Sequence, residues 1–521
     1  MPLKPISHVG GFCNAQDQRR PVEAPIVSGS YPVGLAGSLY TVGPGTYDVK
    51  FSRQGESGAE TRVFSFGHWF DHLPLHGYLP KLPGGLYHTD TNQSFFAKFM
   101  GASKRKSKRP DKEICNGNIL TDFTWPARET SGLVCLNHVG MVQELDPVTL
   151  DPLHITLWDE VDAAFQGTFT SPHPHFDRTT NETVSFTIDV GYRTTEYNVF
   201  STRHNVAEGP TSALLANFVG RPSMVHSFAV TPNYVIIAAY PMGAALSGFR
   251  FVWKNSLLNT FGFSSTEPTL IYVVSRTENR LCTVYQADPF FSLHHVNAFE
   301  DDSDNIYMDL VAYPNDTILH KLDLPNLRNP QTRLQLPAPE IRRYLLASVR
   351  AESRRMNVAT AKLADFPIAH FSCPAKTGVE LPRINPAYHR CSYRYVYGIA
   401  HQDAQSVNPG FWDALKKVDM LREEDTLVWY EPGCYPGEPV FVARSAASLV
   451  SGDDSSSADI PMVSVGAEDE GYIISVVFDS QREQSFVLVL DAANFMEVCR
   501  VALPHVIPLS FGHGSFRSSI A

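Results

Sequence analysis

The runs Tyr472-Ile-Ile-Ser-Val-Val-Phe478 and Ser485-Phe-Val-Leu-Val-Leu490, with the polar segment 479–484 between them, decide the fold class. β-branched and aromatic residues dominate both runs, and such residues favour β-strands. Short runs of the same kind recur along the chain, at 183–189, 234–240, 270–275 and 426–430. Because turn-forming Asp, Asn, Gly and Pro residues separate them, the sequence predicts an all-β protein with a closed or radial arrangement of strands.

Two segments depart from this strand pattern. Residues 411–420 predict a short helix, and residues 445–459, rich in Ser, Ala and Asp, predict an exposed loop. The chain shows no clean internal period of the kind that propeller repeats produce. Periodicity alone therefore does not give the number of repeating units.

Composition and charge exclude several classes of protein. The 521 residues are 43% hydrophobic, which is ample for a large core, and a net charge of -11 gives no reason to expect a nucleic acid as partner. Eight dispersed cysteines without a Cys-x-x-Cys pair favour a reducing compartment over a zinc knuckle or a disulfide framework. Since we find neither a signal-peptide core nor a long apolar run, we expect a cytoplasmic protein with at most peripheral membrane contact.

Four histidines in short aromatic, proline or glycine contexts are the strongest chemical signal. The contexts are Ser171-Pro-His-Pro174, Met224-Val-His-Ser-Phe228, Phe291-Ser-Leu-His-His295 and Phe511-Gly-His-Gly-Ser-Phe516. Residues so far apart in the chain can meet only if the fold brings many segments to a common axis. A set of neutral imidazoles without an obligatory carboxylate suits a divalent transition metal such as iron.

These contexts resemble the carotenoid cleavage oxygenases, non-haem iron enzymes that split a carbon-carbon double bond in polyenes or stilbenes. Other matching stretches lie at 37–45, 68–71, 297–301, 380–385 and 435–439, so the resemblance covers most of the chain, and we expect a fungal-type member. It implies a seven-bladed β-propeller with a dome of loops and short helices over an axial Fe2+ site. On this basis we expect residues 37–521 to form a single propeller domain and residues 1–36 to form an N-terminal extension packed on it.

The resemblance also assigns the catalytic metal ligands, which are His173, His226, His294 and His513. In the family three glutamates fix three such ligands by accepting a hydrogen bond from the second ring nitrogen, and Glu380 and Glu438 match two of them. Alignment from the segment 145–147 places the third at His138, with no carboxylate nearby in the same strand. Either His138 accepts the hydrogen bond as a neutral ring, or an acid from elsewhere fills the role, or the site is impaired.

The residues by themselves leave two ligand positions ambiguous. His173 and His175 can share one face of a strand, whereas His294 and the adjacent His295 must face opposite ways. The family motifs select His173 and His294, although Leu293 replaces one of the family's aromatic residues. A site of two histidines and one carboxylate often shows a His-x-Asp triplet, and the three triplets here, at 88–90, 175–177 and 401–403, are about what chance provides.

The sequence shows no motif for a nicotinamide or flavin cofactor, which bears on the source of electrons for the expected reaction. The chain has no Gly-x-Gly-x-x-Gly fingerprint after a strand, so we expect the electrons to come from an electron-rich alkene. A conjugated alkene meets that need, and the resemblance implies an iron(II) dioxygenase that cleaves a carotenoid or apocarotenoid with O2 to aldehyde or ketone products such as retinal. A stilbene-cleaving dioxygenase and a catalytically silent polyene-binding propeller are the alternatives.

Two residues are candidate substrate contacts, Asn137 and Phe291. Stilbene cleavers of the family carry a lysine at the position of Asn137, and a neutral amide offers no charge to lower a phenol pKa. The apolar segment 241–263, with Phe249, Phe251 and Trp253, is a candidate membrane contact. The basic run 104–109 is a second candidate for contact with anionic lipid.

Overall fold

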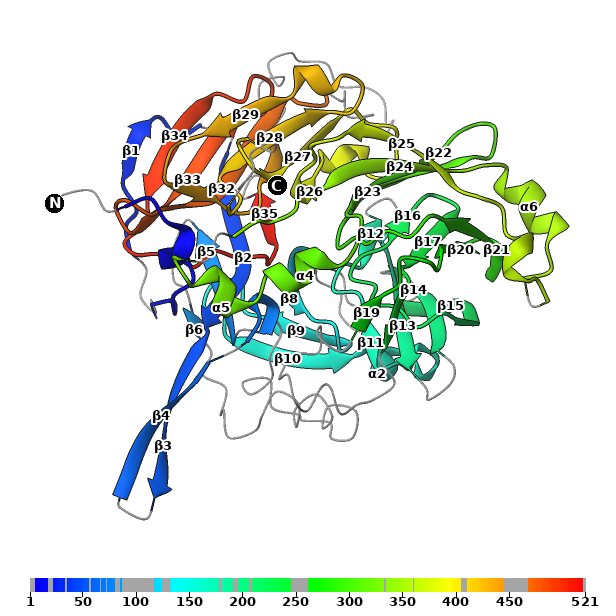
Figure 1. Ribbon diagram of the computed structural model, residues 1–521, viewed down its shortest axis with the longest axis horizontal. Helices are drawn as coiled ribbons and strands as arrows, with labels where there is room; N and C mark the ends of the chain where they lie inside the picture. The colour runs from blue at the N-terminus through cyan, green and yellow to red at the C-terminus, as the bar shows by residue number, and fades with distance from the viewer. Residues whose placement is uncertain are drawn as a thin grey trace.

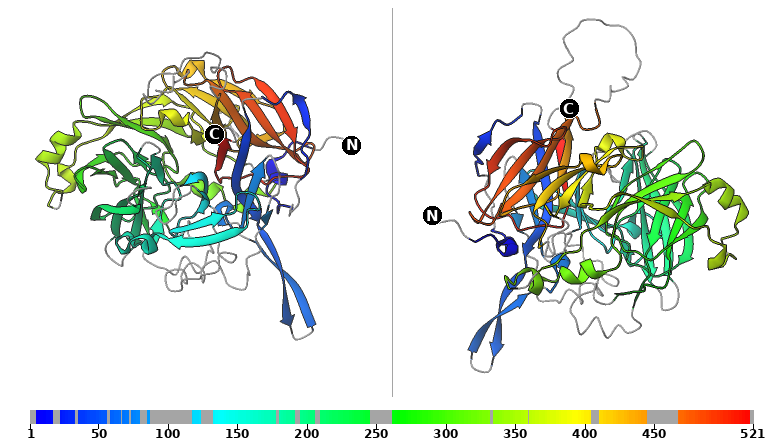
Figure 2. Two further views of the ribbon diagram at one scale, coloured as in Figure 1. Left: turned by 180° about the vertical axis from the view of Figure 1, so that it is seen from behind. Right: turned by 45° about the horizontal axis from the view of Figure 1, so that its top comes forward.

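The computed structural model describes residues 5–16, 22–32, 35–55, 58–65, 67–71, 73–79, 85–86, 117–123, 132–177, 180–190, 195–205, 209–244, 261–331, 334–358, 360–403, 410–444 and 467–518. Within these ranges the chain is mostly β, and its sheets form a ring around a common centre (Figure 1). Two further views show the same ring, with the hairpin of β3 (Asp48–Gly55) and β4 (Gly58–Ser65) projecting from it (Figure 2).

Six sheets are built almost wholly from strands that follow one another in the chain, and each forms one antiparallel blade. The first contains β7 (Asn118–Phe123), β8 (Gly132–Leu136), β9 (Met141–Leu145) and β10 (Pro152–Leu157). The second contains β11 (Phe169–Thr170), β12 (His175–Asp177), β13 (Glu182–Val190), β14 (Thr195–Asn205) and β15 (Gly209–Gly220). The third contains β16 (Ala229–Val230), β17 (Tyr234–Ala239), β20 (Thr269–Ser275) and β21 (Arg280–Ala287).

The other three blades complete most of the ring. The fourth contains β22 (His295–Glu300), β23 (Ile306–Ala312), β24 (Glu340–Leu346) and β25 (His370–Ala375). The fifth contains β26 (Glu380–Arg383), β27 (Tyr395–Ala400), β28 (Ala414–Asp419) and β29 (Leu427–Tyr430). The sixth contains β30 (Cys434–Pro436), β31 (Val440–Ala443), β32 (Gly471–Asp479), β33 (Gln484–Asp491), β34 (Glu497–Ala502) and, from the N-terminal segment, β1 (Ile26–Gly29).

A further sheet joins the two ends of the chain. Its strands are β35 (Gly514–Ser518), β2 (Gly37–Thr46), β5 (Leu73–Leu79) and the two-residue β6 (Gly85–Leu86). The predicted all-β propeller is confirmed. The described strands give six blades made of consecutive strands, where seven blades were expected, and this composite sheet is of a different construction.

Burial on both faces explains the apolar strand sequences. In β17 every residue is buried. Val235 and Ile237 belong to the cluster shared with the second blade, whereas Ile236 and Ala238 face the large central cluster. A strand packed between two neighbouring blades needs apolar residues on both faces, which is why this segment reads as a continuous apolar run.

The helix predicted for residues 411–420 is wrong. The segment contains the strand β28, which pairs with β27 and β29 and is buried at every position. Lys417 is buried with its ammonium donating to Asp469 Oδ2 at 2.6 Å and to Ala493 O at 2.8 Å. Tertiary packing between blades thus overrides the local helical pattern: Lys416 and Lys417 look solvent-exposed in the sequence, yet both are buried, and Lys417 has partners inside the fold.

Short helices lie outside the blades. They are α2 (Trp158–Val161), α4 (Thr317–Lys321), α5 (Leu324–Leu327) and α6 (Val349–Arg355). In Figure 1, α4 and α5 cross the face of the ring near its centre. Ile318, Leu319 and Leu324 pack into the central cluster, so these helices cover the core on that face.

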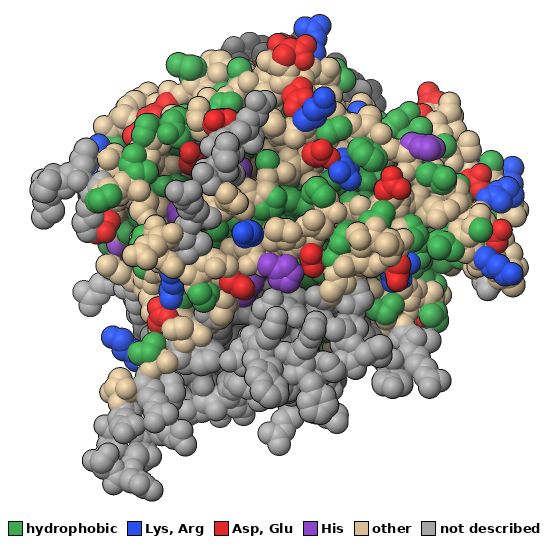
Figure 3. Space-filling view, in the orientation of Figure 1, with side chains coloured by type: hydrophobic (Ala, Val, Ile, Leu, Met, Phe, Trp, Pro, Cys, Tyr) green, Lys and Arg blue, Asp and Glu red, His purple; other side chains and the backbone are tan. Residues whose placement is uncertain are grey.

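Two further features of the described residues concern the lengths of the helices and the side chains on the surface. Among the described residues, the helices are all too short or too polar to cross a membrane. On the described part of the face seen in Figure 3, acidic and basic side chains lie interspersed among apolar ones.

Candidate metal centre

Four segments bring four histidines together at one point. His173 lies between β11 and β12, His226 precedes β16, and His294 and His513 stand directly before β22 and β35. One ring nitrogen of each lies within 4.8 Å of those of the others. These are the four histidines that the sequence singled out. The segments belong to different sheets, so only the ring arrangement brings them together.

Backbone contacts hold the histidine-bearing segments in place. Ser171 Oγ donates to His226 O at 2.7 Å and accepts a hydrogen bond from His173 N at 3.0 Å. Val311 N donates to His294 O at 2.9 Å, and Val42 N donates to His513 O at 3.1 Å. Each imidazole is thus presented from a segment whose main chain is bonded to its surroundings.

Buried carboxylates accept hydrogen bonds from two of the rings. His294 Nδ1 donates to Glu380 Oε2 at 2.7 Å, and His513 Nδ1 donates to Glu438 Oε1. Glu380 is 0% exposed. Because each ring donates through Nδ1, its Nε2 carries the lone pair that a metal requires.

Arg383 neutralises one of these carboxylates. Its guanidinium donates to both oxygens of Glu438, at 2.9 and 3.0 Å, and Gly514 N donates to Glu438 Oε2 at 2.7 Å. Although burial raises the pKa of Glu438, Arg383 and His513 outweigh that effect and hold it at about 2. Arg383 belongs to the sequence stretch 380–385, yet no residue pattern assigned it this role, because its partner Glu438 lies in another blade.

His138 stands where a third carboxylate was expected. Its Nε2 lies 2.8 Å from His226 Nδ1, and the two rings are 4.9 Å apart between centroids. Burial lowers the pKa of His138 to about 4, so the ring is neutral at pH 7. A neutral His138 with its proton on Nδ1 accepts from His226 Nδ1 and leaves His226 Nε2 free, so among the three possibilities the geometry favours the neutral acceptor.

His173 has a weaker outer contact. Asn118 Nδ2 lies 3.4 Å from His173 Nδ1 and also donates to Pro172 O at 3.1 Å. Burial and, to a smaller extent, four neighbouring histidines hold the pKa of His173 well below its ordinary value, and burial does the same to the pKa of His226. Asn118 was not anticipated from the sequence, where it looks like an ordinary residue at a strand start.

The two neighbouring histidines lie outside the group. His175 Nδ1 contacts His389 Nε2 at 2.9 Å and its Nε2 donates to Phe228 O at 2.8 Å. His295 Nδ1 contacts Ser227 Oγ at 2.8 Å. In each ambiguous motif only one histidine joins the group. His173 and His294 are directed at the shared point, whereas His175 and His295 are directed elsewhere.

The candidate substrate residues occupy packed positions. Asn137 Oδ1 accepts from Val139 N and Met141 N, both at 3.1 Å, and so caps the turn between β8 and β9. Phe291 is fully buried in the central cluster, with its ring 5.6 Å from that of Tyr240. Neither placement by itself identifies a substrate contact.

The candidate membrane contacts cannot be placed. Phe249, Phe251, Trp253, the basic run 104–109 and the predicted loop at 445–459 lie outside the described residues.

The donor set fits a transition-metal ion. In the part of the chain that the structure describes, His294 Nε2 and His513 Nε2 are buried without a hydrogen-bond partner, and His173 Nε2 faces His226 Nε2 at 3.0 Å. Unsatisfied buried nitrogens are costly, and four imidazole lone pairs directed at one point satisfy a divalent metal. The group is therefore one that could hold a metal ion.

The comparisons with known proteins agree with this geometry. A carotenoid dioxygenase of Neurospora crassa is 24% identical over 97% of this chain and 90% of that protein. The β,β-carotene 15,15′-dioxygenase of Mus musculus is 26% identical over 96% of this chain and 90% of that protein. The crystal structure of a cobalt-substituted Synechocystis oxygenase, ACO, superposes with a TM-score of 0.69 at 20% identity and 98% coverage of both chains.

The family model described as RPE65, retinal pigment epithelial membrane protein, matches residues 83–518. This range includes the four clustered histidines and the outer partners Glu380, Glu438 and His138. Because the match spans most of the chain, the protein belongs to the RPE65 family of carotenoid oxygenases.

Proposed function

We propose that this protein uses iron(II) and O2 to cleave a conjugated double bond of a carotenoid or apocarotenoid. The observation that supports this most strongly is the group of four histidines, three of them buried and three of them bonded to an outer partner. The relatives are named as dioxygenases of β-carotene and, in Fusarium, of torulene. Their shared substrate class is a long conjugated polyene.

The residues of this chain would have two roles at the metal: some would bind it, and others would orient those ligands. His173, His226, His294 and His513 would hold Fe2+, which when bound supplies the activation of dioxygen. Glu380, Glu438 and His138 would keep the ring protons on Nδ1, so that each Nε2 is available as a ligand. Since all four ligands are neutral, the metal keeps its full charge.

A polyene is the favoured substrate over a hydroxystilbene. At position 137 an amide replaces the lysine of stilbene cleavers, and its oxygen is already engaged in the β8–β9 turn. Asn137 therefore cannot activate a phenol by lowering its pKa. A polyene is electron-rich by conjugation, and burial of its apolar surface supplies binding at roughly 25 cal/mol per Å2. Insertion of O2 across one double bond then gives two carbonyl products.

We also propose a seventh blade and an N-terminal extension for this chain. We assign the composite sheet of β35, β2, β5 and β6 as a seventh blade, because β35 and β2 contact β7 and β35 contacts β31. Residues 1–36 form the extension, since β1 pairs with β34 and the composite sheet begins at Gly37. Peripheral membrane contact by a cytoplasmic protein is the expected route for a substrate that dissolves in lipid.

One observation favours a second function. His138 occupies a position where a carboxylate would otherwise hold His226, and a weakened metal site would leave a polyene-binding propeller without catalysis. Iron-loaded protein incubated aerobically with a panel of carotenoids, apocarotenals and stilbenes separates the two. Aldehyde products detected by mass analysis support the oxygenase, whereas polyene retention without products supports the silent binder.

A further inference from the structure

Tyr313 is a fully buried residue directly after β23. Phe291 N donates to Tyr313 O at 3.0 Å and Tyr313 N donates to Phe291 O at 2.8 Å, while Val311 N donates to His294 O. Tyr313 and His294 are thus carried by two backbone segments that are bonded to each other. Their relative position is set by the main chain of the fourth blade.

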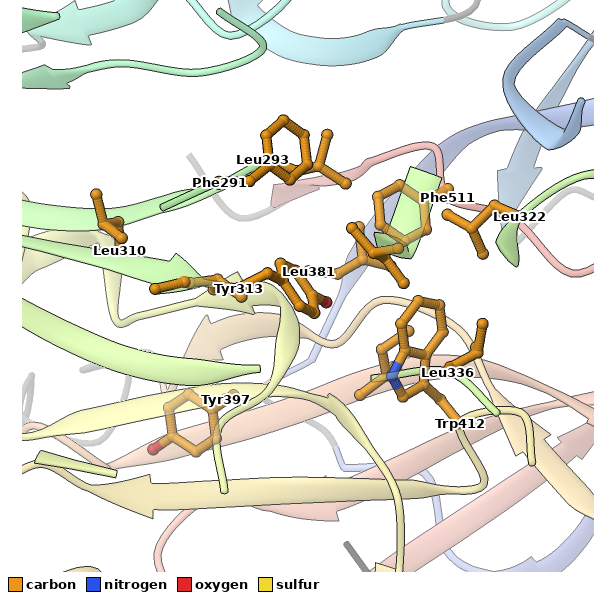
Figure 4. Packing of buried hydrophobic residues seen from close by; sticks show 14 of the residues in the cluster. Phe291, Leu293, Leu310, Tyr313, Leu322, Leu336, Leu381, Tyr397, Trp412 and Phe511 are labelled. Atoms are coloured by element: carbon orange, nitrogen blue, oxygen red, sulfur yellow. The ribbon is translucent and has the colours of Figure 1, made fainter. Parts of the chain in front are cut away.

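The hydroxyl of Tyr313 reaches the partner of His294. It donates to Glu380 Oε1 at 2.6 Å, while His294 Nδ1 donates to Glu380 Oε2 at 2.7 Å. Glu380 begins β26 in the fifth blade, so this carboxylate links two blades beside the histidine group. In Figure 4 the hydroxyl of Tyr313 is directed toward Leu381, whereas that of Tyr397 points away from it.

Among the described residues, no Lys or Arg side chain bonds to Glu380, whereas Arg383 bonds to Glu438. In the described part of the chain its side-chain donors are Tyr313 and His294, whereas Glu438 binds the Arg383 guanidinium through both oxygens. A buried carboxylate without a cation is costly unless hydrogen bonds satisfy it. The tyrosine hydroxyl therefore takes the place that the guanidinium has at the other carboxylate.

The backbone next to Glu380 adopts a rare conformation that adds to this arrangement. Leu381 is buried with φ at 50°, in the left-handed region that non-glycine residues seldom occupy. In this conformation Leu381 N donates to Glu380 Oε2 at 3.1 Å. Both carboxylate oxygens are thereby held, one by the tyrosine and the other by the backbone and His294.

We infer that Tyr313 is a positioning residue that fixes the Glu380 carboxylate and, through it, the ring of His294 toward the metal. The inference rests on the proposed metal site. Without the hydroxyl, Glu380 Oε1 loses its donor and the carboxylate is held only through Oε2, so His294 has a less rigid acceptor. The consequence is a looser metal ligand in a fold that is otherwise unchanged.

The test compares Tyr313→Phe with Tyr397→Phe in the full chain loaded with Co(II). Tyr397 is the matched control because it is a fully buried tyrosine of the same cluster whose hydroxyl has no hydrogen-bond partner among the described residues. We expect Tyr313→Phe to accelerate removal of Co(II) by a chelator about tenfold, at the low end of outer-partner effects. Tyr397→Phe should leave the rate within about twofold of the native protein.

A spectroscopic readout separates positioning from a general loss of stability. In the Co(II) protein the exchangeable N–H protons of bound imidazoles give strongly shifted NMR signals, and Tyr313→Phe should move one of them while Tyr397→Phe moves none. In a Glu380→Gln background, Tyr313→Phe should change the release rate by less than about twofold, because the shared partner is already lost. If Tyr313→Phe fails to fold, 3-fluorotyrosine at position 313, a stronger donor of the same shape, should move the same signal.

The outcomes distinguish this inference from the function on which it rests. Equal Co(II) release from the two tyrosine variants, with unmoved imidazole signals, overturns the role of Tyr313 and leaves the metal site intact. Failure of the native protein to take up either Co(II) or Fe(II) overturns the proposed function and this inference with it.

Discussion

The two halves of the histidine group are held by different chemistry. His294 and His513 donate to buried carboxylates, and such charge-assisted bonds are about twice as strong as neutral ones. His173 and His226 face neutral partners, Asn118 and His138. One half is thus fixed by ionised side chains from the fifth and sixth blades, whereas the other half depends on neutral contacts and on backbone bonds through Ser171.

This difference sets the charge around a bound metal. Glu380, Glu438 and Arg383 together contribute one net negative charge, and His138 adds none while it is neutral. On the side of His226, therefore, His138 supplies no negative charge to compensate that of a divalent metal. A carboxylate beside a ligand histidine both orients the ring and compensates the charge of the metal. His138 can orient the ring of His226 but supplies no compensating charge.

Removing a ligand should have the largest effect. Replacement of any one of His173, His226, His294 and His513 by Ala should lower metal retention and turnover by more than about 100-fold, since a ligand costs more than an outer partner. Metal content by mass spectrometry and aldehyde formation measure this. His295→Ala is the control, because His295 bonds Ser227 and not the group. Full activity of a ligand variant would remove that histidine from the site.

Substitution of the two carboxylates that accept from His294 and His513 should have the next largest effect on metal retention. Glu380→Gln and Glu438→Gln should each accelerate metal release by about 10- to 100-fold. We expect the larger change at Glu438, because Gln leaves the Arg383 guanidinium without its counter-charge. Chelator-driven release of Co(II) measures both. Equal and small changes would mean that the carboxylates are not what stabilises this half.

The sequence predicted the fold class, and it singled out the four histidines that the structure brings together, better than it predicted their surroundings. The strand runs and the spacing of His173, His226, His294 and His513 point to many segments meeting at one axis, and the resemblance supplied Glu380 and Glu438. Such motif residues are local signals. They can be read without knowing which strands are neighbours.

The rest depends on contacts between blades. Arg383 finds Glu438 across a blade boundary, and the tyrosine that meets Glu380 comes from the preceding blade. The helix expected at 411–420 is a strand because Lys416 and Lys417 are buried between sheets. Pairing across blades leaves no periodic trace in the chain, so these features were not predictable from residue patterns.

Acidification should affect the neutral half in a specific way. Burial holds the pKa of His138 at about 4 and those of His173 and His226 well below their ordinary value. Because the unfolded chain then binds more protons than the folded one between about pH 6.5 and 4, stability must fall as the pH falls through this window. For His138 alone the loss is on the order of 3 kcal/mol.

Urea unfolding of the metal-free protein at pH 7.5 and pH 5 measures this. His138→Gln, which does not titrate in this range, should retain a shallower dependence on pH than the native protein. A pH dependence identical to that of the native protein would mean that His138 is not buried as a neutral ring.

The smallest expected change comes from putting an acid at position 138, and it tests the comparison most directly. If His138 orients His226 as a neutral acceptor at 2.8 Å, the role is already filled, so His138→Glu should leave metal release and turnover within about threefold of the native protein. His138→Ala should release the metal about tenfold faster, because His226 then loses its acceptor. A large gain in metal retention with His138→Glu would show instead that charge, and not ring orientation, is what the neutral half lacks. In that case the difference between the halves would mark a weakened metal site, and the silent polyene-binding function would become the better explanation of the protein.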